Sequence, residues 1–147
     1  MEIAFKHMQE SDIDGVTEVY IKTFASEPWN EVWEKSLAKE RIMALFSGET
    51  HRGYIAFCGG KMAAILLGYD SVFLQGKEFW IEEFCVLPEY QRMGIGQSML
   101  CWIKKELSEE NFKSLVLITQ KDFPSEKFYR KNGFESNENM ILMYSDF

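Results

Sequence analysis

Several features are scarce in this sequence, and each scarcity excludes a class of protein. No apolar run approaches the roughly 20 residues that a membrane-spanning helix needs, so we expect no membrane partner. Basic residues are in deficit, because 16 Lys and Arg stand against 23 Asp and Glu, which gives a formal net charge of −7. A protein that binds nucleic acid needs a basic surface. We therefore expect no nucleic-acid partner.

Cysteine is also scarce. The chain has three, Cys58, Cys85 and Cys101, an odd number, and none is spaced like a pair of metal ligands. The N-terminus does not resemble a signal peptide. Reduced thiols in a cytoplasmic protein without a metal site are therefore expected.

The remaining composition favours a packed globular protein. Apolar residues make up 46% of the chain and aromatic residues 15%, which is enough for a sizeable core. A chain of 147 residues without repeats or linkers predicts one domain, residues 1–147. The acidic balance would attract a cationic substrate, although solubility alone explains it equally well.

The most informative stretch runs from Phe79 to Leu107. It reads as an apolar strand, a turn that contains Gly94 and Gly96, and then an amphipathic helix. Backbone N–H groups of such a turn and the N-terminus of the following helix attract an anion. Small residues in the turn let a phosphate approach the backbone closely. The stretch therefore predicts a phosphate-binding site.

Two common glycine fingerprints do not fit this turn. A dinucleotide-binding turn needs a third glycine where Met99 stands, and the Gly-Lys-Ser/Thr of a P-loop is absent. The segment from Val86 to Gly96 instead resembles the acyl-CoA pyrophosphate loop of the GNAT superfamily of N-acetyltransferases. Gln91, Gly94 and Gly96 fit the family consensus Gln/Arg-x-x-Gly-x-Gly/Ala.

A second family signature supports the resemblance. The segment from Phe128 to Phe134 reads Phe-Tyr-x-x-x-Gly-Phe, roughly thirty residues after the loop. The resemblance implies that acetyl-CoA is the co-substrate. The implied binding residues are the backbone of Cys85, Val86 and Leu87 together with Gln91, Arg92, Met93, Gly94, Ile95, Gly96, Gln97 and Ser98.

The order of the expected elements agrees with that family. Patterning predicts strands over 3–6, 53–58, 61–69, 79–87, 114–119 and about 140–144. Helices are expected over 13–24, 33–45 and 95–107, with a short one from Pro124. We therefore expect a mixed α/β GNAT fold, in which a central sheet of six to seven strands is flanked by about four helices.

Glu82 and Glu83 are the candidates for the base that deprotonates the acceptor amine. Both lie in an otherwise apolar strand, where a buried carboxylate needs a partner. Strand alternation predicts that they face opposite sides of the sheet. The stretch resembles spermidine/spermine N-acetyltransferases, which implies that Glu82 is the base. Alternatively, both acids are structural ion-pair partners and a water chain removes the proton.

Tyr129 is the expected acid for the departing thiolate of CoA, because similar members of the family use this tyrosine near the CoA sulfur. Simple packing beneath the co-substrate is the alternative. Cys85 is not expected to form an acetyl-enzyme, because nothing nearby in the sequence lowers the pKa of its thiol. His7 and His51 are expected to be surface residues.

The acceptor site is expected near Phe24, Trp29 and Trp33, with Tyr69 and Phe73 as further candidates. The segment around Trp29 resembles bacterial aminoglycoside-like acetyltransferases. Aromatic rings and acids together can hold a cation. Packing of the tryptophans in the core is the alternative.

The resemblance implies an N-acetyltransferase that moves an acetyl group from acetyl-CoA to a primary amine of a small, cationic molecule by direct attack in a ternary complex. A peptide or protein N-acetyltransferase is one alternative. A non-catalytic acyl-CoA-binding regulatory module is another. Because many members of the family are dimers, the resemblance also favours a homodimer.

Overall fold

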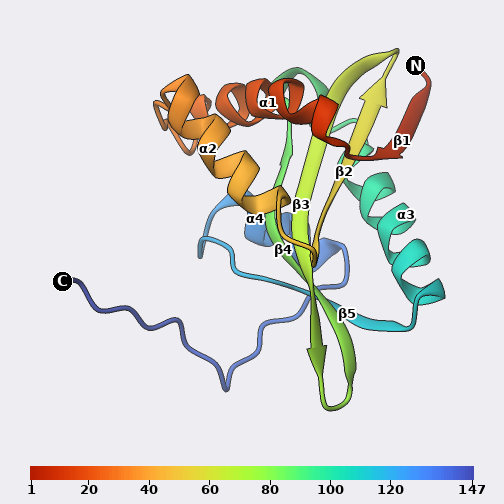
Figure 1. Cartoon of the computed structure of the whole chain (residues 1–147), viewed down its shortest axis with the longest axis vertical. Helices are drawn as coiled ribbons and strands as arrows, with labels where there is room; N and C mark the ends of the chain where they lie inside the picture. The colour runs from red at the N-terminus through yellow and green to blue at the C-terminus, as the bar shows by residue number, and fades with distance from the viewer.

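The computed structural model describes all of residues 1–147, and it contains five strands and four α-helices (Figure 1). The strands are β1 (Ile3–His7), β2 (His51–Cys58), β3 (Lys61–Phe73), β4 (Gly76–Val86) and β5 (Phe112–Leu117). The helices are α1 (Ile13–Ala25), α2 (Lys35–Phe46), α3 (Ile95–Glu109) and α4 (Pro124–Lys131). Short 3-10 turns cover Glu10–Asp12 and Pro88–Tyr90. The mixed α/β class and the four helices confirm the prediction.

The five strands form one sheet in the order β1-β2-β3-β4-β5. The pairs β1–β2, β2–β3 and β3–β4 are antiparallel, whereas β4 and β5 pair in parallel. Parallel neighbours need a crossover connection, and α3 provides it. The predicted strand–helix–strand unit is therefore confirmed.

Helices cover both faces of the sheet. On one face, Val16 and Tyr20 of α1 and Ile42 of α2 pack in a core with apolar side chains of β2 and β3. On the other face, Met99 and Ile103 of α3 pack in a second core. Figure 1 shows α1 and α2 on one side of the sheet and α3 on the other. None of the helices is both long enough and apolar enough to cross a bilayer.

A β-bulge in β4 changes the direction of the two glutamates. Leu67 of β3 pairs with Glu83, but the next residue, Gly68, pairs with Ile81, so Glu82 is an extra residue in β4. Ile81 packs in the core under α3, whereas Glu83 reaches a side chain of α2. Alternation restarts at the bulge, and both glutamates face the side of α1 and α2. The prediction of opposite faces was wrong because it assumed an uninterrupted strand.

The same point in β4 is where its pairing with β5 ends. The register runs from Lys77 opposite Phe112 to Ile81 opposite Leu117. β4 continues to Val86, but β5 contributes no partner there. The backbone edge of β4 beyond the bulge is therefore open to another hydrogen-bonding group.

The sheet has five strands rather than the six to seven that were predicted. No strand follows α4, and the expected strand at about 140–144 is an unpaired segment whose large side chains are all exposed. The residues there are apolar and β-prone, which is why the sequence pattern favours a strand. A strand also needs a partner edge, and local sequence does not specify that edge.

Gly68 stands opposite the bulge, and we expect Gly68→Ala to destabilise the fold by about 1–3 kcal/mol. A Cβ there would collide with the carbonyl oxygen of Trp80 and lie 2.6 Å from the ring of Phe79. Gly15→Ala is the matched control, because its Cβ would meet only the flexible end of Met62 and alanine favours a helix. Equal melting temperatures for the two variants would contradict the crowded packing at Gly68.

Candidate active site

The loop between β4 and α3 is held by its own side chains and by its glycine. The side-chain amide of Gln91 donates a hydrogen bond to the carbonyl of Val86 at 2.9 Å, which ties the loop to the end of β4. Gly94 has φ +80 and Arg92 has φ +61. A left-handed conformation at Gly94 costs glycine little but would strain a side chain. Gln91 therefore supports the loop, and Gly94 allows its turn.

The turn presents the N-terminus of α3 without a cap. Gly94 is the N-cap residue, and no side chain hydrogen-bonds the first turn. The amides of Ile95, Gly96 and Gln97 belong to that turn, where N–H groups lack intrahelical partners. Such N–H groups and the helix dipole together attract an anion. The backbone is therefore suited to hold the pyrophosphate of CoA.

Gly96 joins the two family motifs in space. It is buried, and a Cβ there would lie 3.0 Å from the ring of Phe128 and 3.6 Å from Val86. Phe128 belongs to the second motif and packs against the core beneath α3. Gly96 is therefore needed for close packing of α3 against β4 and α4.

The other predicted loop residues lie around this turn. Arg92, Met93 and Gln97 are exposed, and their side chains can reach a bound molecule, as can that of Ser98. Ile95 is 1% exposed and packs in the core, which leaves only its backbone N–H for a ligand.

Glu83 is clamped by residues of both covering helices. The guanidinium of Arg41 donates hydrogen bonds to its carboxylate from Nη2 at 2.6 Å and from Nε at 3.1 Å. The hydroxyl of Tyr20 donates a longer one at 3.5 Å. The side chain of Glu83 is only 11% exposed. Burial raises the pKa of this carboxyl above its usual range, and Arg41 acts in the opposite direction.

Glu82 has a different environment. Its side chain is 29% exposed, and one carboxylate oxygen lies 3.4 Å from Nε2 of His51. The other ring nitrogen of His51 is buried and has no hydrogen-bond partner. Of the two carboxylates, that of Glu82 is therefore the more exposed.

Tyr129 lies close to the open part of β4. Its ring packs against Phe84, Phe128 and Phe134, with centroid distances of 6.4, 5.4 and 5.2 Å. Burial raises the pKa of the Tyr129 phenol well above its usual value, and the neighbouring Cys85 and Glu83 raise it further. The phenol therefore keeps its proton at neutral pH and can donate a hydrogen bond.

Cys85 is not prepared to act as a nucleophile. Its thiol is buried, and burial raises its pKa to about 12, although Thr23 hydrogen-bonds to it and partly opposes this rise. A thiolate is the reactive form of cysteine. The environment of Cys85 agrees with the expectation that no acetyl-enzyme forms.

The three predicted acceptor-site aromatics meet around Tyr20. The ring of Tyr20 lies 4.8 Å from Phe24 and 5.2 Å from Trp33, and Phe24 lies 5.4 Å from Trp29. The indole N–H of Trp33 donates to Glu31 at 2.8 Å. This aromatic cluster borders the clamped carboxylate of Glu83, because Tyr20 contacts both.

The two further aromatic candidates lie elsewhere. Tyr69 stacks on Trp80 at 6.3 Å and contacts His51 at 5.7 Å, so it belongs to the surroundings of Glu82. Phe73 is 53% exposed at the end of β3, and it has no contact with the aromatic cluster around Tyr20.

Sequence reasoning missed three residues that shape this site. Arg41 and Tyr20 fix Glu83, and His51 contacts Glu82, although His51 was expected only to be a surface residue. These partners are 31 to 63 residues away from the glutamates in sequence. Only Arg41 could have been found from the sequence, because it is a basic residue on the predicted inner face of an amphipathic helix.

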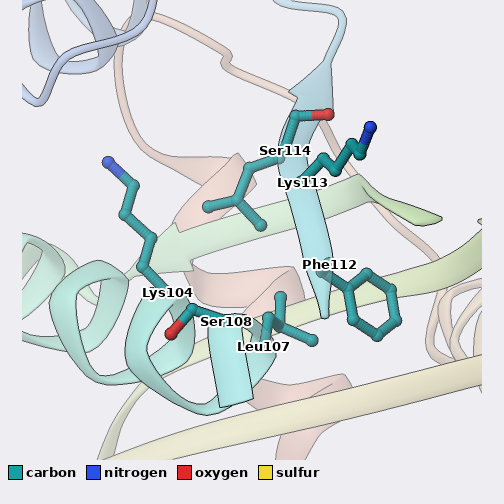
Figure 2. Close-up of a pocket in the computed structure, with 7 residues that line it drawn as sticks. Lys104, Leu107, Ser108, Phe112, Lys113 and Ser114 are labelled. Carbon is teal, nitrogen blue, oxygen red and sulfur yellow. The ribbon is translucent and has the colours of Figure 1, made fainter. Parts of the chain in front are cut away.

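A hollow between α3 and β5 is separate from this site. It encloses about 270 Å³ and is lined in part by Lys104, Leu107, Phe112 and Lys113. Figure 2 shows Lys104 and Lys113 extending to opposite sides. No residue of the loop, of the glutamate pair or of the aromatic cluster lines it.

The clamp on Glu83 predicts a large loss of stability when its partner is removed. We expect Arg41→Met to destabilise the fold by about 1–3 kcal/mol, because a nearly buried carboxylate is left without its partner. Adding Glu83→Gln to the same chain should recover part of that loss, since a neutral amide replaces the charge.

Arg130→Met is the matched control for this pair. Its partner Glu126 lies one helical turn away, and the Arg130 side chain is 51% exposed, so water screens the pair and its loss should change the stability little. Chemical denaturation measures the free energy of unfolding of the wild type, Arg41→Met, the double variant and Arg130→Met. A loss for Arg41→Met no larger than that for Arg130→Met would contradict the clamp.

Comparison with known proteins agrees with the motifs. The model of the acetyltransferase (GNAT) family matches residues 15–134. The chain therefore belongs to the GNAT family, and it is an acetyl-CoA-dependent N-acetyltransferase. None of the curated proteins compared with it matches the chain.

Solved structures with the same fold cover essentially the whole chain. A possible acetyltransferase from Clostridium difficile 630 has a TM-score of 0.80 at 19% identity, with all of both chains covered. The aminoglycoside acetyltransferase AAC(6')-Iy, in complex with the bisubstrate analogue CoA-S-monomethyl-acetylneamine, has a TM-score of 0.76 at 12% identity, again over both whole chains. A ribosomal-protein-alanine N-acetyltransferase from Brucella melitensis biovar Abortus 2308 has a TM-score of 0.78 at 11% identity, over 98% of this chain and 100% of that one.

Proposed function

We propose that this protein transfers the acetyl group of acetyl-CoA directly to a primary amine of a small, cationic molecule. One observation carries the proposal. Glu82 and Glu83 face the same side of the sheet, at the point where β4 and β5 separate and beside an aromatic cluster. The thioester of acetyl-CoA would lie between the separated strands, and carboxylates and aromatic rings would hold the cationic acceptor. The two reactants would therefore meet at this point.

The chain's backbone would position the acetyl donor. The uncapped N-terminus of α3 receives the pyrophosphate, and the open edge of β4 at Cys85 and Val86 pairs with the amide groups of the pantetheine arm. Leu87, which was also expected to bind through its backbone, lies past the end of β4, and its N–H already donates to the carbonyl of Ala63 while its carbonyl accepts from Tyr90. A free N–H of that edge would donate to the thioester oxygen as negative charge develops on it. The thioester then lies next to Tyr129.

Glu82 would act as the general base. A primary amine with a pKa near 10 is mostly protonated at neutral pH, so it must lose a proton before it attacks. The amine nitrogen bonds to the thioester carbon, its proton passes to the carboxylate of Glu82, and the carbon–sulfur bond breaks. The hydroxyl of Tyr129 donates its hydrogen to the departing sulfur.

The acceptor's charge would be recognised by the acids and rings. Glu31 is fixed by Trp33, Glu83 is fixed by Tyr20 and Arg41, and the formal net charge of the chain is −7. Rings and carboxylates favour a cation over a neutral amine. AAC(6')-Iy was solved with a CoA–neamine conjugate, which supports an acceptor of the polyamine or aminoglycoside class.

An acceptor panel tests the proposal. Release of free CoA thiol is followed with spermidine, neamine, a peptide with an N-terminal alanine and the neutral amide of each charged amine. Spermidine or neamine should give acceptor-dependent release that the neutral analogues do not. Preference for the peptide would instead assign the site to a peptide or protein N-acetyltransferase. No release with any amine would overturn the proposed acceptor class.

Compartment and assembly form part of the same proposal. Cys58, Cys85 and Cys101 are all free thiols, which fits a reducing compartment, so we place the protein in the cytoplasm. We also propose that it is a homodimer, as many members of the family are.

A further inference from the structure

Glu82 has a single polar neighbour among the side chains of the protein. Nε2 of His51 lies 3.4 Å from one oxygen of its carboxylate, and no other side chain forms a hydrogen bond or an ion pair with that carboxylate. Glu83 differs in this respect, because Arg41 and Tyr20 hold it together. Of the polar contacts in the structure, only the one with His51 can orient the carboxylate of Glu82.

The ring of His51 is itself held by its surroundings. His51 is the first residue of β2, and its backbone N–H donates to the carbonyl of Gly48 at 3.0 Å. Its ring packs against that of Tyr69, with the centroids 5.7 Å apart. On the other side the ring lies directly against Gly48, where an added Cβ would collide with Nδ1. Gly48 therefore provides the space that the ring occupies.

The two ring nitrogens of His51 have different surroundings, and the difference selects a tautomer. A neutral imidazole has one N–H and one bare nitrogen. Nδ1 is buried without a hydrogen-bond partner, and a buried N–H without an acceptor carries a full desolvation cost. The tautomer with its hydrogen on Nδ1 would also turn the lone pair of Nε2 toward the carboxylate of Glu82. The tautomer with its hydrogen on Nε2 avoids both costs.

We propose that His51 is a positioning residue for acetyl transfer, because its Nε2–H donates to the carboxylate of Glu82 and fixes the direction of that carboxylate. The proposal rests on the proposed role of Glu82 as the base. His51 does not relay the proton of the amine, since Nε2 already carries a hydrogen and Nδ1 is buried against Gly48.

One N–H donor orients the carboxylate without occupying it. A carboxylate has about four lone-pair sites, so Glu82 can still accept the proton of the amine. The separation of 3.4 Å is long for a hydrogen bond, and hydrogen bonds in catalytic sites commonly shorten when the substrate is bound. A misplacement of about 1 Å can lower a rate by about 100-fold. Removal of the donor should therefore slow the reaction rather than weaken donor binding.

Two substitutions of His51 separate its N–H from its bulk. His51→Met removes the donor, and it should lower kcat by about 10- to 100-fold with an unchanged KM for acetyl-CoA. His51→Gln is the matched variant, because its amide N–H extends about as far from the backbone as Nε2 does. It should recover most of the lost rate. A wild-type kcat in His51→Met, or equal losses in the two variants, would contradict positioning by the N–H.

Gly48→Ala moves the ring without changing its chemistry. The backbone at Gly48 does not have a positive φ, so alanine fits there, but its Cβ would displace Nδ1. We expect the rate to fall as it does in His51→Met. Gly15→Ala is the control, because its Cβ meets only Met62, and it should keep the wild-type rate. A wild-type rate in Gly48→Ala would also count against the proposal.

Nitrogen NMR of His51 tests the tautomer without any turnover. The chemical shifts of the ring nitrogens distinguish a nitrogen that carries a hydrogen from a bare one. The wild type should carry its hydrogen on Nε2 alone, and Gly15→Ala should give the same spectrum. A hydrogen on Nδ1, in the neutral or the charged ring, would refute the assignment.

A double variant separates this proposal from the proposed function. If Glu82→Gln loses the rate and adding His51→Met causes no further loss, His51 acts through Glu82. If the two losses multiply, His51 acts elsewhere and only its positioning role is overturned. If Glu82→Gln keeps the wild-type rate, Glu82 is not the base, and the role of His51 is overturned with it.

Discussion

Glu82→Gln is expected to lower the rate of acetyl transfer by about 10²–10⁴-fold at neutral pH, the usual contribution of a general base. The amide keeps the shape of the side chain but cannot accept the proton of the amine. The Glu82 side chain touches His51 rather than the loop at α3, so affinity for acetyl-CoA should not change. Acceptor-dependent release of CoA measures the rate, and calorimetric titration measures the affinity.

Glu83→Gln is the matched comparison. It makes the same change one residue away on the same face, but at a carboxylate that Arg41 and Tyr20 hold. We expect it to reduce stability more than rate. If Glu83→Gln loses the rate and Glu82→Gln keeps it, Glu83 is the base. If both variants keep the rate, a water chain removes the proton.

Gly94→Glu is expected to weaken binding of acetyl-CoA by about 100-fold or more, close to 3 kcal/mol. The new side chain would bring bulk and negative charge to the uncapped N-terminus of α3, where the pyrophosphate is expected. A Cβ at Gly94 would meet no other atom within 4 Å, so the fold has room for the substitution. Calorimetric titration of the folded variant measures the effect.

Gly60→Glu controls for the cost of the backbone conformation. Gly60 also has a positive φ, +81, and open space around it, but it lies in the β2–β3 turn. Both variants therefore carry similar backbone strain and the same added charge. Only Gly94→Glu should lose affinity for acetyl-CoA. Undiminished affinity in that variant would remove the basis for the loop assignment.

The parts of the site that sequence predicted are those encoded locally. The Gln91–Gly96 loop, the helix that follows it and the βαβ unit follow from residues adjacent in the chain, and the structure places them together. The prediction of a six- or seven-stranded sheet was wrong, because the strand character of residues 140–144 does not supply a partner edge.

The environment of the glutamates was not predictable for a different reason. Glu82 and Glu83 were assigned to opposite faces by simple alternation, and one extra residue in β4 reversed that result. Neither the bulge nor the approach of Arg41 and His51 from other elements has a signal in the neighbouring sequence. Long-range packing determines both.

Thermal melting with and without acetyl-CoA is the most direct test of donor binding at the loop. At about 100 times Kd, a ligand that binds only the folded chain adds roughly 2.7 kcal/mol of stability. For a chain of 147 residues this should raise the melting temperature by several degrees. A rise with acetyl-CoA that NAD and ATP do not match is the predicted result. No rise would contradict the assignment of the loop between β4 and α3 to the acetyl donor.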